Sequence, residues 1–183
     1  MRRELTKLAR PASRGRHYHP RMDERWKPSV TVAAVVERDG RYLLVEEETS
    51  DGLRLNNPAG HLDPGESLVQ AVVRETLEET ACPFEPDALV GIYLATTARP
   101  GAEPVTYLRF AFAGRAGEPL NGRTLDRGIV RTLWLTPAEV RASAARHRSP
   151  LVLRCIEDFV AGRCYPLELI TTDGTVFVPE IKR

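Results

Sequence analysis

The chain has 183 residues and a formal net charge of +1, with 42% hydrophobic and 28% charged residues, a composition typical of one globular domain. No apolar run approaches the roughly 20 residues that span a bilayer, so we do not expect a membrane protein. The three cysteines, Cys82, Cys155 and Cys164, lie far apart without CxxC spacing, which argues against a disulfide framework or a structural zinc site and favours the cytoplasm.

The first residues of the chain are strongly basic. Residues 1–27 contain nine Lys or Arg against three acidic residues, so the rest of the chain is acidic. Arginines without apolar periodicity usually form a solvated terminus, although nucleic acids and acidic membrane surfaces also attract such charge. We therefore expect a basic, flexible extension over 1–27 and one folded domain over 28–183, without a nucleic-acid or membrane partner. Monomer and homodimer both stay open.

Two strands are predicted at the start of the domain. β-Branched residues predominate from Val30 to Val36, Asp39-Gly40 follows as a turn signal, and residues 41–47 continue as an apolar run that ends in acidic residues. This pattern predicts a β-hairpin. Residues 49–64 are rich in Asp, Gly, Asn and Pro, which predicts a loop with one short extended piece.

A helix is predicted to begin at Ser67, which has capping-box spacing to Gln70, and to extend to about Thr80. Further elements are predicted downstream: strands over 88–97, 104–114 and 129–135, a helix opened by Thr136-Pro137, and a helix over 150–160. Strands and helices intermix without a regular βαβ rhythm. We therefore expect an α/β fold in which a mixed β-sheet is sandwiched between α-helices.

Three glutamates share one side of the helix that begins at Ser67. Glu78 and Glu79 follow Glu75 by three and four residues, so the like charges crowd together. A divalent cation would remove this repulsion, and Mg²⁺ prefers carboxylate and carbonyl oxygens, usually together with substrate phosphates. The pattern indicates a Mg²⁺ site, with Mn²⁺ as a second possible ion, and a small phosphorylated substrate. Because an acidic helix is most often just a solvated face, the neighbouring residues decide between the two interpretations.

Those neighbours support a site. Gly60 lies in the loop just ahead of the helix, and Glu66 precedes Arg74 by eight residues, about two helical turns. An ion pair between Glu66 and Arg74 would brace the loop against the helix, which is a structural role.

The spacing of these residues matches a known motif. The chain resembles the Nudix hydrolase family, whose box G-x5-E-x7-R-E-U-x-E-E-x-G-U is matched by Gly60, Glu66, Arg74, Glu75, Glu78 and Glu79. The resemblance implies an α/β/α Nudix fold in which the three helix glutamates are catalytic and bind the metal together with the Gly60 carbonyl. One glutamate often also serves as the base, and which one varies within the family. Ala81 replaces the usual glycine of the box and Thr76 an aliphatic residue, so the helix end is expected to change while the chemistry survives.

Within that family the chain is most similar to the NudJ-type phosphatases, over about residues 27–170. The segments Pro58-Ala59-Gly60-His61-Leu62 and Arg148-Ser149-Pro150 are among those that carry the likeness. It implies a rather unselective phosphatase that releases orthophosphate from nucleoside tri- and diphosphates and from thiamine-related pyrophosphates. One alternative is a pyrophosphohydrolase that cuts nucleoside diphosphate derivatives and releases a monophosphate. The other is a regulatory nucleotide-binding module without catalysis, against which the complete set of box carboxylates argues.

Further substrate contacts are expected outside the box. Arg109, in a predicted strand, would suit bidentate phosphate binding if it faces a cleft, with Arg54, Arg148 and Arg131 as the alternatives. His61 follows Gly60 closely enough to approach the metal or the phosphates, although a structural role is slightly favoured. Tyr107, Phe110 and Trp134 could each stack on a ring, but aromatic residues in strands are more often core. The branch resemblance alone implicates Arg148 and Tyr165, and Asp126 is a loose candidate for a further acidic ligand.

Overall fold

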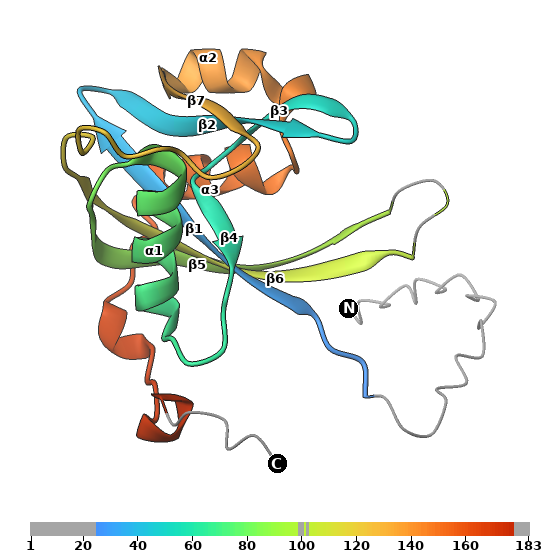
Figure 1. Ribbon diagram of the computed structural model, residues 1–183, viewed down its shortest axis with the longest axis vertical. Coiled ribbons are helices and arrows are strands. Elements are labelled where there is room, and N and C mark those ends of the chain that lie inside the picture. The colour runs from blue at the N-terminus through green and yellow to red at the C-terminus, as the bar shows by residue number, and fades with distance from the viewer. Residues whose placement is uncertain (1–24, 99–100, 102, 178–183) are drawn as a thin grey trace, which may run out of the picture.

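The structure, a computed structural model, describes residues 25–98, 101 and 103–177 (Figure 1). It opens with the predicted hairpin, in which β1 (Ser29–Arg38) and β2 (Arg41–Thr49) pair antiparallel. The two turn residues, Asp39 and Gly40, have φ angles of 51° and 74°, the left-handed backbone that a tight two-residue hairpin turn requires.

The remaining strands extend this hairpin into one mixed sheet. They are β3 (Gly52–Asn56), β4 (Ala59–His61), β5 (Phe84–Thr97), β6 (Val105–Ala116) and β7 (Ile129–Leu135). The strand order is β3-β2-β1-β6-β5, while β4 pairs with β1 and β7 pairs with β2. β1 and β6 run parallel, with eight residue pairs from Ser29–Tyr107 to Val36–Gly114. The central strand β1 is therefore completed by segments far away in the sequence.

In the described part of the chain, three α-helices and three short 3₁₀ helices accompany the sheet. The α-helices are α1 (Leu68–Thr80), α2 (Pro137–Ala142) and α3 (Leu151–Val160), and the 3₁₀ helices are η1 (Ala144–Arg146), η2 (Leu167–Leu169) and η3 (Gly174–Phe177). α1 begins with the predicted capping box between Ser67 and Gln70. It ends at Ala81, whose φ of 60° is left-handed and whose N–H donates to the Leu77 carbonyl. Alanine thus keeps the turn that a glycine would make, at a cost of roughly 1–2 kcal/mol. The expected change at the helix end is absent.

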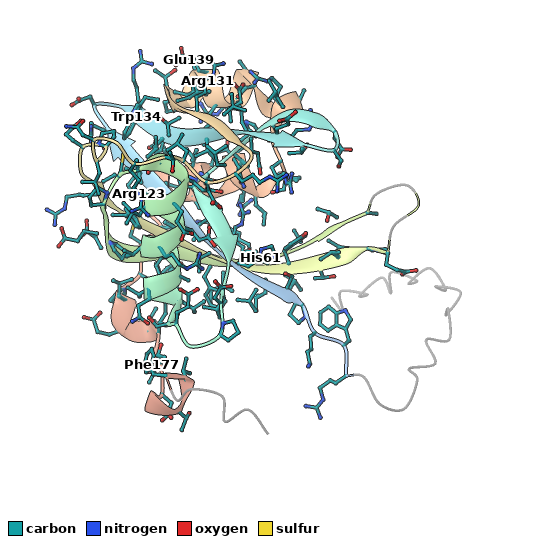
Figure 2. The ribbon with its side chains drawn as sticks, in the orientation of Figure 1. His61, Arg123, Arg131, Trp134, Glu139 and Phe177 are labelled. Carbon is teal, nitrogen blue, oxygen red and sulfur yellow. The ribbon has the colours of Figure 1, made fainter. Side chains whose placement is uncertain are left out.

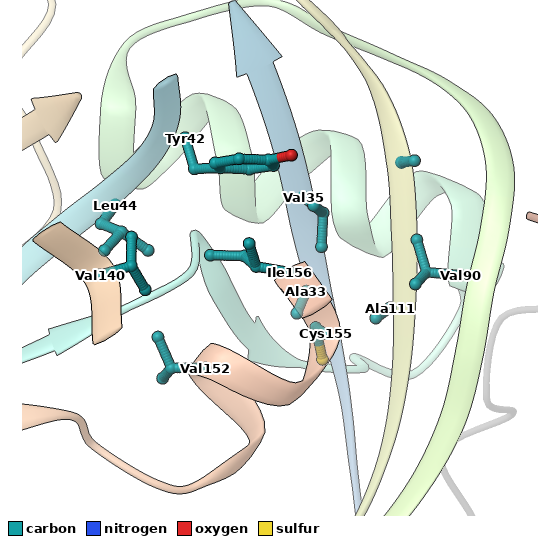
Figure 3. Packing of buried hydrophobic residues seen from close by; sticks show 11 residues of the cluster. Ala33, Val35, Tyr42, Leu44, Val90, Ala111, Val140, Val152, Cys155 and Ile156 are labelled. Atoms are coloured by element: carbon teal, nitrogen blue, oxygen red, sulfur yellow. The ribbon is translucent and has the colours of Figure 1, made fainter. Parts of the chain in front are cut away.

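The core lies on both faces of the sheet. On one face Ala33 and Val35 of β1 pack with α3 residues such as Cys155 and Ile156 (Figure 3). On the other face Val32, Ala34 and Val36 belong to a second cluster, which includes Ala71 and Val72 of α1. A strand buried on both faces needs a continuous apolar run, which explains why residues 32–36 do not alternate with polar residues. The predicted sandwich of helices around a mixed sheet is confirmed.

The segment 49–64 differs from the prediction. It contains two short strands, β3 and β4, where one loop with a single extended piece was expected. β3 pairs with β2, and β4 pairs with β1 through Ala59, Gly60 and His61. These pairings override a composition that is typical of loops. β5 also begins earlier than predicted and includes Pro86, which an edge strand tolerates because one side of its backbone makes no ladder bonds.

Two expectations concern the N-terminal extension and membrane-spanning helices. The predicted extension over 1–27 lies almost wholly outside the described residues, so the proposed domain boundary stays a prediction. None of the helices in the described ranges is long and apolar enough to cross a membrane.

Candidate metal and phosphate site

A cavity of about 650 Å³ brings acidic and basic side chains together from distant parts of the chain. Glu75 and Glu79 of α1 line it, and the loop before β7 adds Asp126. Arg109 of β6 and Arg148, just before α3, line the same cavity. Two of the three helix glutamates and the expected phosphate-binding arginine therefore share one space.

Glu79 is the most deeply buried of the three helix glutamates, with 8% of its surface exposed. Its Oε2 accepts a hydrogen bond of 2.8 Å from the N–H of Ala59 in β4. The pKa of Glu79 is raised to about 8, chiefly by burial and also by the nearby charges of Glu75, Glu47 and Asp126, while the Ala59 bond opposes the rise. An ionised carboxylate in this place is costly unless a positive charge lies beside it.

Arg74 organises the carboxylates on the outer side of α1. Its Nη2 and Nε donate to both oxygens of Glu66, at 2.7 and 3.0 Å, and Nη2 also donates to the His61 carbonyl at 2.9 Å. Its Nη1 donates to Glu75 at 2.8 Å and to Glu78 at 3.0 Å. The structure thus brings Arg74 and Glu66 together as a brace between the loop and the helix. The same guanidinium orients two of the box glutamates.

Gly60 leaves room for a carboxylate. A Cβ built on Gly60 would lie 2.1 Å from Cδ of Glu75 and 2.2 Å from both carboxylate oxygens. No side chain fits there, and Gly60 is not among the glycines with positive φ. Glycine is needed at this position for space, because β4 and the Glu75 carboxylate approach each other closely.

The donor atoms suit a hard divalent cation. Carboxylate oxygens of Glu75 and Glu79 line the cavity beside Gly60, and oxygen donors of this kind are what Mg²⁺ and Mn²⁺ prefer. Among the described residues, no three His, Cys, Asp or Glu side chains already converge as in a formed metal site. The reason is visible for Glu78, which is bonded to Arg74 and does not line the cavity. The residues fit a cation, but Glu78 would have to exchange its partner to reach one.

Arg109 projects from the floor of the cavity and is 8% exposed. Within the described ranges, neither Nε nor Nη1 of this residue has a hydrogen-bond partner. Burial lowers its pKa, and the nearby Cys155, Glu47 and Glu79 raise it, whereas Arg148 lowers it further. Burying a guanidinium whose N–H groups have no acceptor costs free energy of folding. The same N–H groups are suited to donate hydrogen bonds to an anionic ligand.

The other predicted contact residues are divided between cavity and core. His61 and Tyr107 both line the cavity, with ring centroids 6.3 Å apart, and His61 lies on β4, where it pairs with Thr31 of β1 (Figure 2). Phe110 and Trp134 instead pack against the α1 side of the core. Tyr165 pairs with Leu89 outside the cavity.

Asp126 and Arg131, two further candidates from the sequence, lie in different places relative to the cavity. Asp126 lines the cavity, because its N–H donates to the Glu78 carbonyl at 2.9 Å and holds the loop against α1. Arg131 does not line it and is bonded to Glu46 at 2.7 Å. Leu55 of β3 is 1% exposed and part of the interior.

Sequence reasoning missed several polar residues of the cavity floor. Thr31, Glu47 and Asn56 line the cavity and, like Arg109, carry buried polar atoms without a hydrogen-bond partner among the described residues. The only signal for Glu47 was its place in the acidic run at the end of a predicted strand. The alternation of side chains along β2 buries Glu46 against two arginines and turns Glu47 to the cavity, which depends on pairing with β3 and β7.

Comparisons with known proteins show the family and the fold. A family model described as NUDIX domain matches residues 25–155. The Phosphatase NudJ of Escherichia coli (strain K12) is 37% identical over 145 residues, which cover 79% of this chain and 92% of that protein. The structure of a NUDIX hydrolase from Nitrosomonas europaea has a TM-score of 0.76 and 52% identity, covering 80% of this chain and 98% of that one. The MutT NUDIX hydrolase from Burkholderia pseudomallei, with a TM-score of 0.60, 22% identity and coverage of 73% and 98%, shows the same fold.

Proposed function

Because the chain belongs to the NUDIX family and is a hydrolase of phosphoric anhydrides, we propose that it is a divalent-metal-dependent phosphatase that releases orthophosphate from nucleoside tri- and diphosphates. The Phosphatase NudJ relative supports this activity over the pyrophosphohydrolase alternative. Thiamine-related pyrophosphates are included as further candidate substrates, on the resemblance alone. The cytoplasm remains the location proposed from the cysteine pattern, and both monomer and homodimer stay open.

One observation carries the proposal: the cavity places the carboxylates of Glu75 and Glu79 and the guanidinium of Arg109 around a single space. Phosphoric anhydrides are negatively charged, so a site made of carboxylates alone would repel them. A cation on the carboxylates and a buried guanidinium opposite them together make the cavity suitable for phosphate.

The metal would be Mg²⁺ or Mn²⁺, held by Glu75, Glu78 and Glu79 with the carbonyl oxygen of Gly60. When bound, it supplies charge neutralisation at the phosphate and lowers the pKa of water. The fit rests on the space that Gly60 leaves for the Glu75 carboxylate and on the buried charge of Glu79.

The chain's own residues position the reacting groups. Ala59 fixes the Glu79 carboxylate by its N–H, and Arg74 fixes that of Glu75 by its Nη1. Arg109 would bind phosphate oxygens through Nε and Nη1, with Arg148 beside it at the cavity wall. His61 and Tyr107 would contact the organic part of the substrate. The carboxylates are thus fixed at one end of the cavity and the guanidiniums at the other. This arrangement reduces the entropy that the substrate loses in the transition state.

The decisive experiment is a substrate screen with identification of every product. Purified full-length protein with Mg²⁺ or Mn²⁺ is incubated with nucleoside tri- and diphosphates, thiamine pyrophosphate and sugar nucleotides. Orthophosphate from a nucleoside diphosphate is the expected result. Nucleoside monophosphate with pyrophosphate from a triphosphate would establish the pyrophosphohydrolase alternative. Binding of nucleotides without turnover in either metal would instead establish the regulatory module.

A further inference from the structure

The N-terminus of α3 opens on the same cavity, on the side away from α1. Ser149, just before the helix, and Leu151, its first residue, both line the cavity. α3 has ten residues and no acidic residue in its first turn, so its positive N-terminal end is not compensated from within the helix. Among the residues that the structure describes, the Leu151 N–H donates only to the Ser149 hydroxyl, at the long distance of 3.3 Å. This end of the helix can attract an anion.

A second and independent feature points to a ligand there. Arg109 is more than nine-tenths buried, and two of its nitrogens point at no described partner. Arg109 is paired across the sheet with Thr31 of β1 and Tyr93 of β5. The three side chains therefore lie on the same face of the sheet, the face covered by α3. Tyr93 donates to Asp158 of α3 at 3.1 Å, which confirms that this face is the one that α3 covers.

The charges around this place leave a positive excess. Arg148 precedes α3, lines the cavity and has 35% of its side chain exposed. Its Nε lies 3.7 Å from Oε1 of Glu47, which is the acidic neighbour of both arginines. Two guanidiniums and a helix N-terminus lie beside Glu47, with Glu79 as the second acidic neighbour of Arg109, so the positive groups outnumber the carboxylates at this end of the cavity.

We propose that Arg109, Arg148 and the N-terminus of α3 form a separate anion subsite, which binds a second phosphoryl group of the substrate while the α1 carboxylates serve the phosphoryl group that is attacked. The inference rests on the proposed function for the identity of the anion. The subsite explains why a buried arginine is left without a partner, and it divides the cavity into a cation-binding end and an anion-binding end. A substrate with two or more linked phosphates would occupy both ends together.

The subsite can be tested without catalysis and without metal. Inorganic phosphate is titrated into the full-length protein in EDTA by isothermal titration calorimetry. We expect saturable binding to the wild type and to Glu79→Gln, because the subsite does not use the α1 carboxylates. Arg148→Ala should weaken binding at least about tenfold, as expected for loss of a charge-assisted contact. Arg123→Ala is the matched control, because Arg123 does not line the cavity and lies on the other side of α1 from His61 (Figure 2).

The helix end is tested by a pair of variants at one position. Ser149→Asp adds a negative charge at the N-terminus of α3, which favours the helix but repels phosphate. Ser149→Asn has nearly the same shape without the charge. We expect Ser149→Asp to keep or raise the melting temperature and to weaken phosphate binding about tenfold relative to Ser149→Asn. Equal phosphate affinity in these two variants would overturn the role of the helix.

Steady-state kinetics distinguish binding of a substrate phosphoryl group at the subsite from binding of free orthophosphate. With metal present, Arg148→Ala should lower kcat/KM for a nucleoside diphosphate at least about tenfold relative to Arg123→Ala. Phosphate binding that Arg148→Ala and Arg109→Ala both leave unchanged, or that requires metal in the wild type, would overturn the subsite. Loss of phosphate binding with unchanged kinetics would mean that only free orthophosphate binds there, which also contradicts the proposal. If the wild type hydrolysed no anhydride, the proposed function would fail, and the titration in EDTA would still decide the anion subsite.

Discussion

The carboxylate of Glu75 occupies the space in which a side chain at position 60 would have to lie. The Cβ of any residue placed there would come within 2.1 Å of Cδ of Glu75. Arg74 donates to the same carboxylate at 2.8 Å, so Glu75 has little freedom to withdraw. Gly60 is therefore a requirement of the site as much as the glutamates are.

Gly60→Ala should strongly lower activity although it removes no charge and no polar group. The new methyl group displaces Glu75, and a misplacement of about 1 Å at a reacting centre costs on the order of 100-fold in rate. Steady-state kinetics on a nucleoside diphosphate measure the effect. Gly174→Ala is the control, because Gly174 has open space around its Cβ position. Equal kcat/KM in these two variants would contradict the close packing of Gly60 on Glu75.

Glu79→Gln should lower turnover by at least about 100-fold while the fold stays intact. The amide can still accept the Ala59 hydrogen bond through its oxygen, so the contact with β4 survives. Because glutamine never carries a charge in this buried place, whereas ionisation of Glu79 there is costly, we expect the melting temperature of the variant in EDTA to be equal to or higher than that of the wild type. Turnover near the wild-type value would refute the role of Glu79 in the metal site.

Mg²⁺ should stabilise the wild type more than it stabilises Glu79→Gln. A ligand that binds only the native state raises the melting temperature, and the rise grows with the logarithm of the ligand concentration relative to Kd once the ligand is in excess. The measurement is a series of thermal melts with increasing MgCl₂, with the same ionic strength made up by KCl as the control. A rise in melting temperature of the same size in both proteins would place the cation elsewhere.

Arg109→Lys should impair the enzyme although it keeps the positive charge. Lysine lacks the planar fork that binds two phosphate oxygens at once, and loss of a charge-assisted hydrogen bond corresponds to roughly a ten- to a hundredfold fall in kcat/KM. Circular dichroism and thermal melting establish first that the variant is folded. If both Arg109→Lys and Arg109→Ala matched the wild type, the phosphate contact would have to be sought at Arg54 or Arg148, which line the same cavity.

The brace between Glu66 and Arg74 predicts a pH-dependent contribution to stability. The hydrogen bonds from Arg74 hold the pKa of Glu66 below its ordinary value of 4.5, opposed by burial. A lowered carboxyl pKa means that the contribution is full above pH 4.5 and is lost as the pH falls through the pKa of the folded state. Glu66→Gln should therefore cost about 1–2 kcal/mol at pH 7.

Denaturant unfolding at pH 7 and at the lowest pH where both proteins remain folded checks this prediction. The difference in free energy of unfolding between wild type and Glu66→Gln should shrink at the lower pH. Glu118→Gln is a suitable control, since the partner pair Arg38–Glu118 is exposed. A difference that does not change with pH would contradict the ionic character of the brace.

The sequence predicts those parts of the fold that depend on local chemistry. The Asp39-Gly40 turn and the capping box of Ser67 are each set by a few neighbouring residues, and both are found as expected. The strands β3 and β4 were not foreseen, because their stability comes from pairing with β2 and β1 and not from their own residues. A parallel neighbour for β1 also has no local signal, because the partner begins at Val105.

The site shows the same division. The helical spacing of Glu75 and Glu79 was enough to place both on one side of α1. The i,i+4 spacing of Arg74 and Glu78 also allows the ion pair that the structure shows, but it does not reveal that Glu78 then lies outside the cavity. Likewise, the sequence shows that Arg109 lies in a strand but not which face of that strand is covered by α3. Only the position of β6 between β1 and β5 decides that the guanidinium is buried.

The parallel pairing of β1 with β6 has a consequence for how the protein is made. β1 leaves the ribosome early, yet the strand that completes it ends at Ala116, and β7, which completes β2, ends at Leu135. During synthesis the apolar faces of the first hairpin therefore stay exposed to solvent until the later strands have been made. Pairing between segments that are distant in the sequence is also slow. The intervening chain includes α1, so the glutamates are synthesised before the sheet that orients them is complete. The nascent chain is expected to be most prone to aggregation between the synthesis of β2 and that of β6.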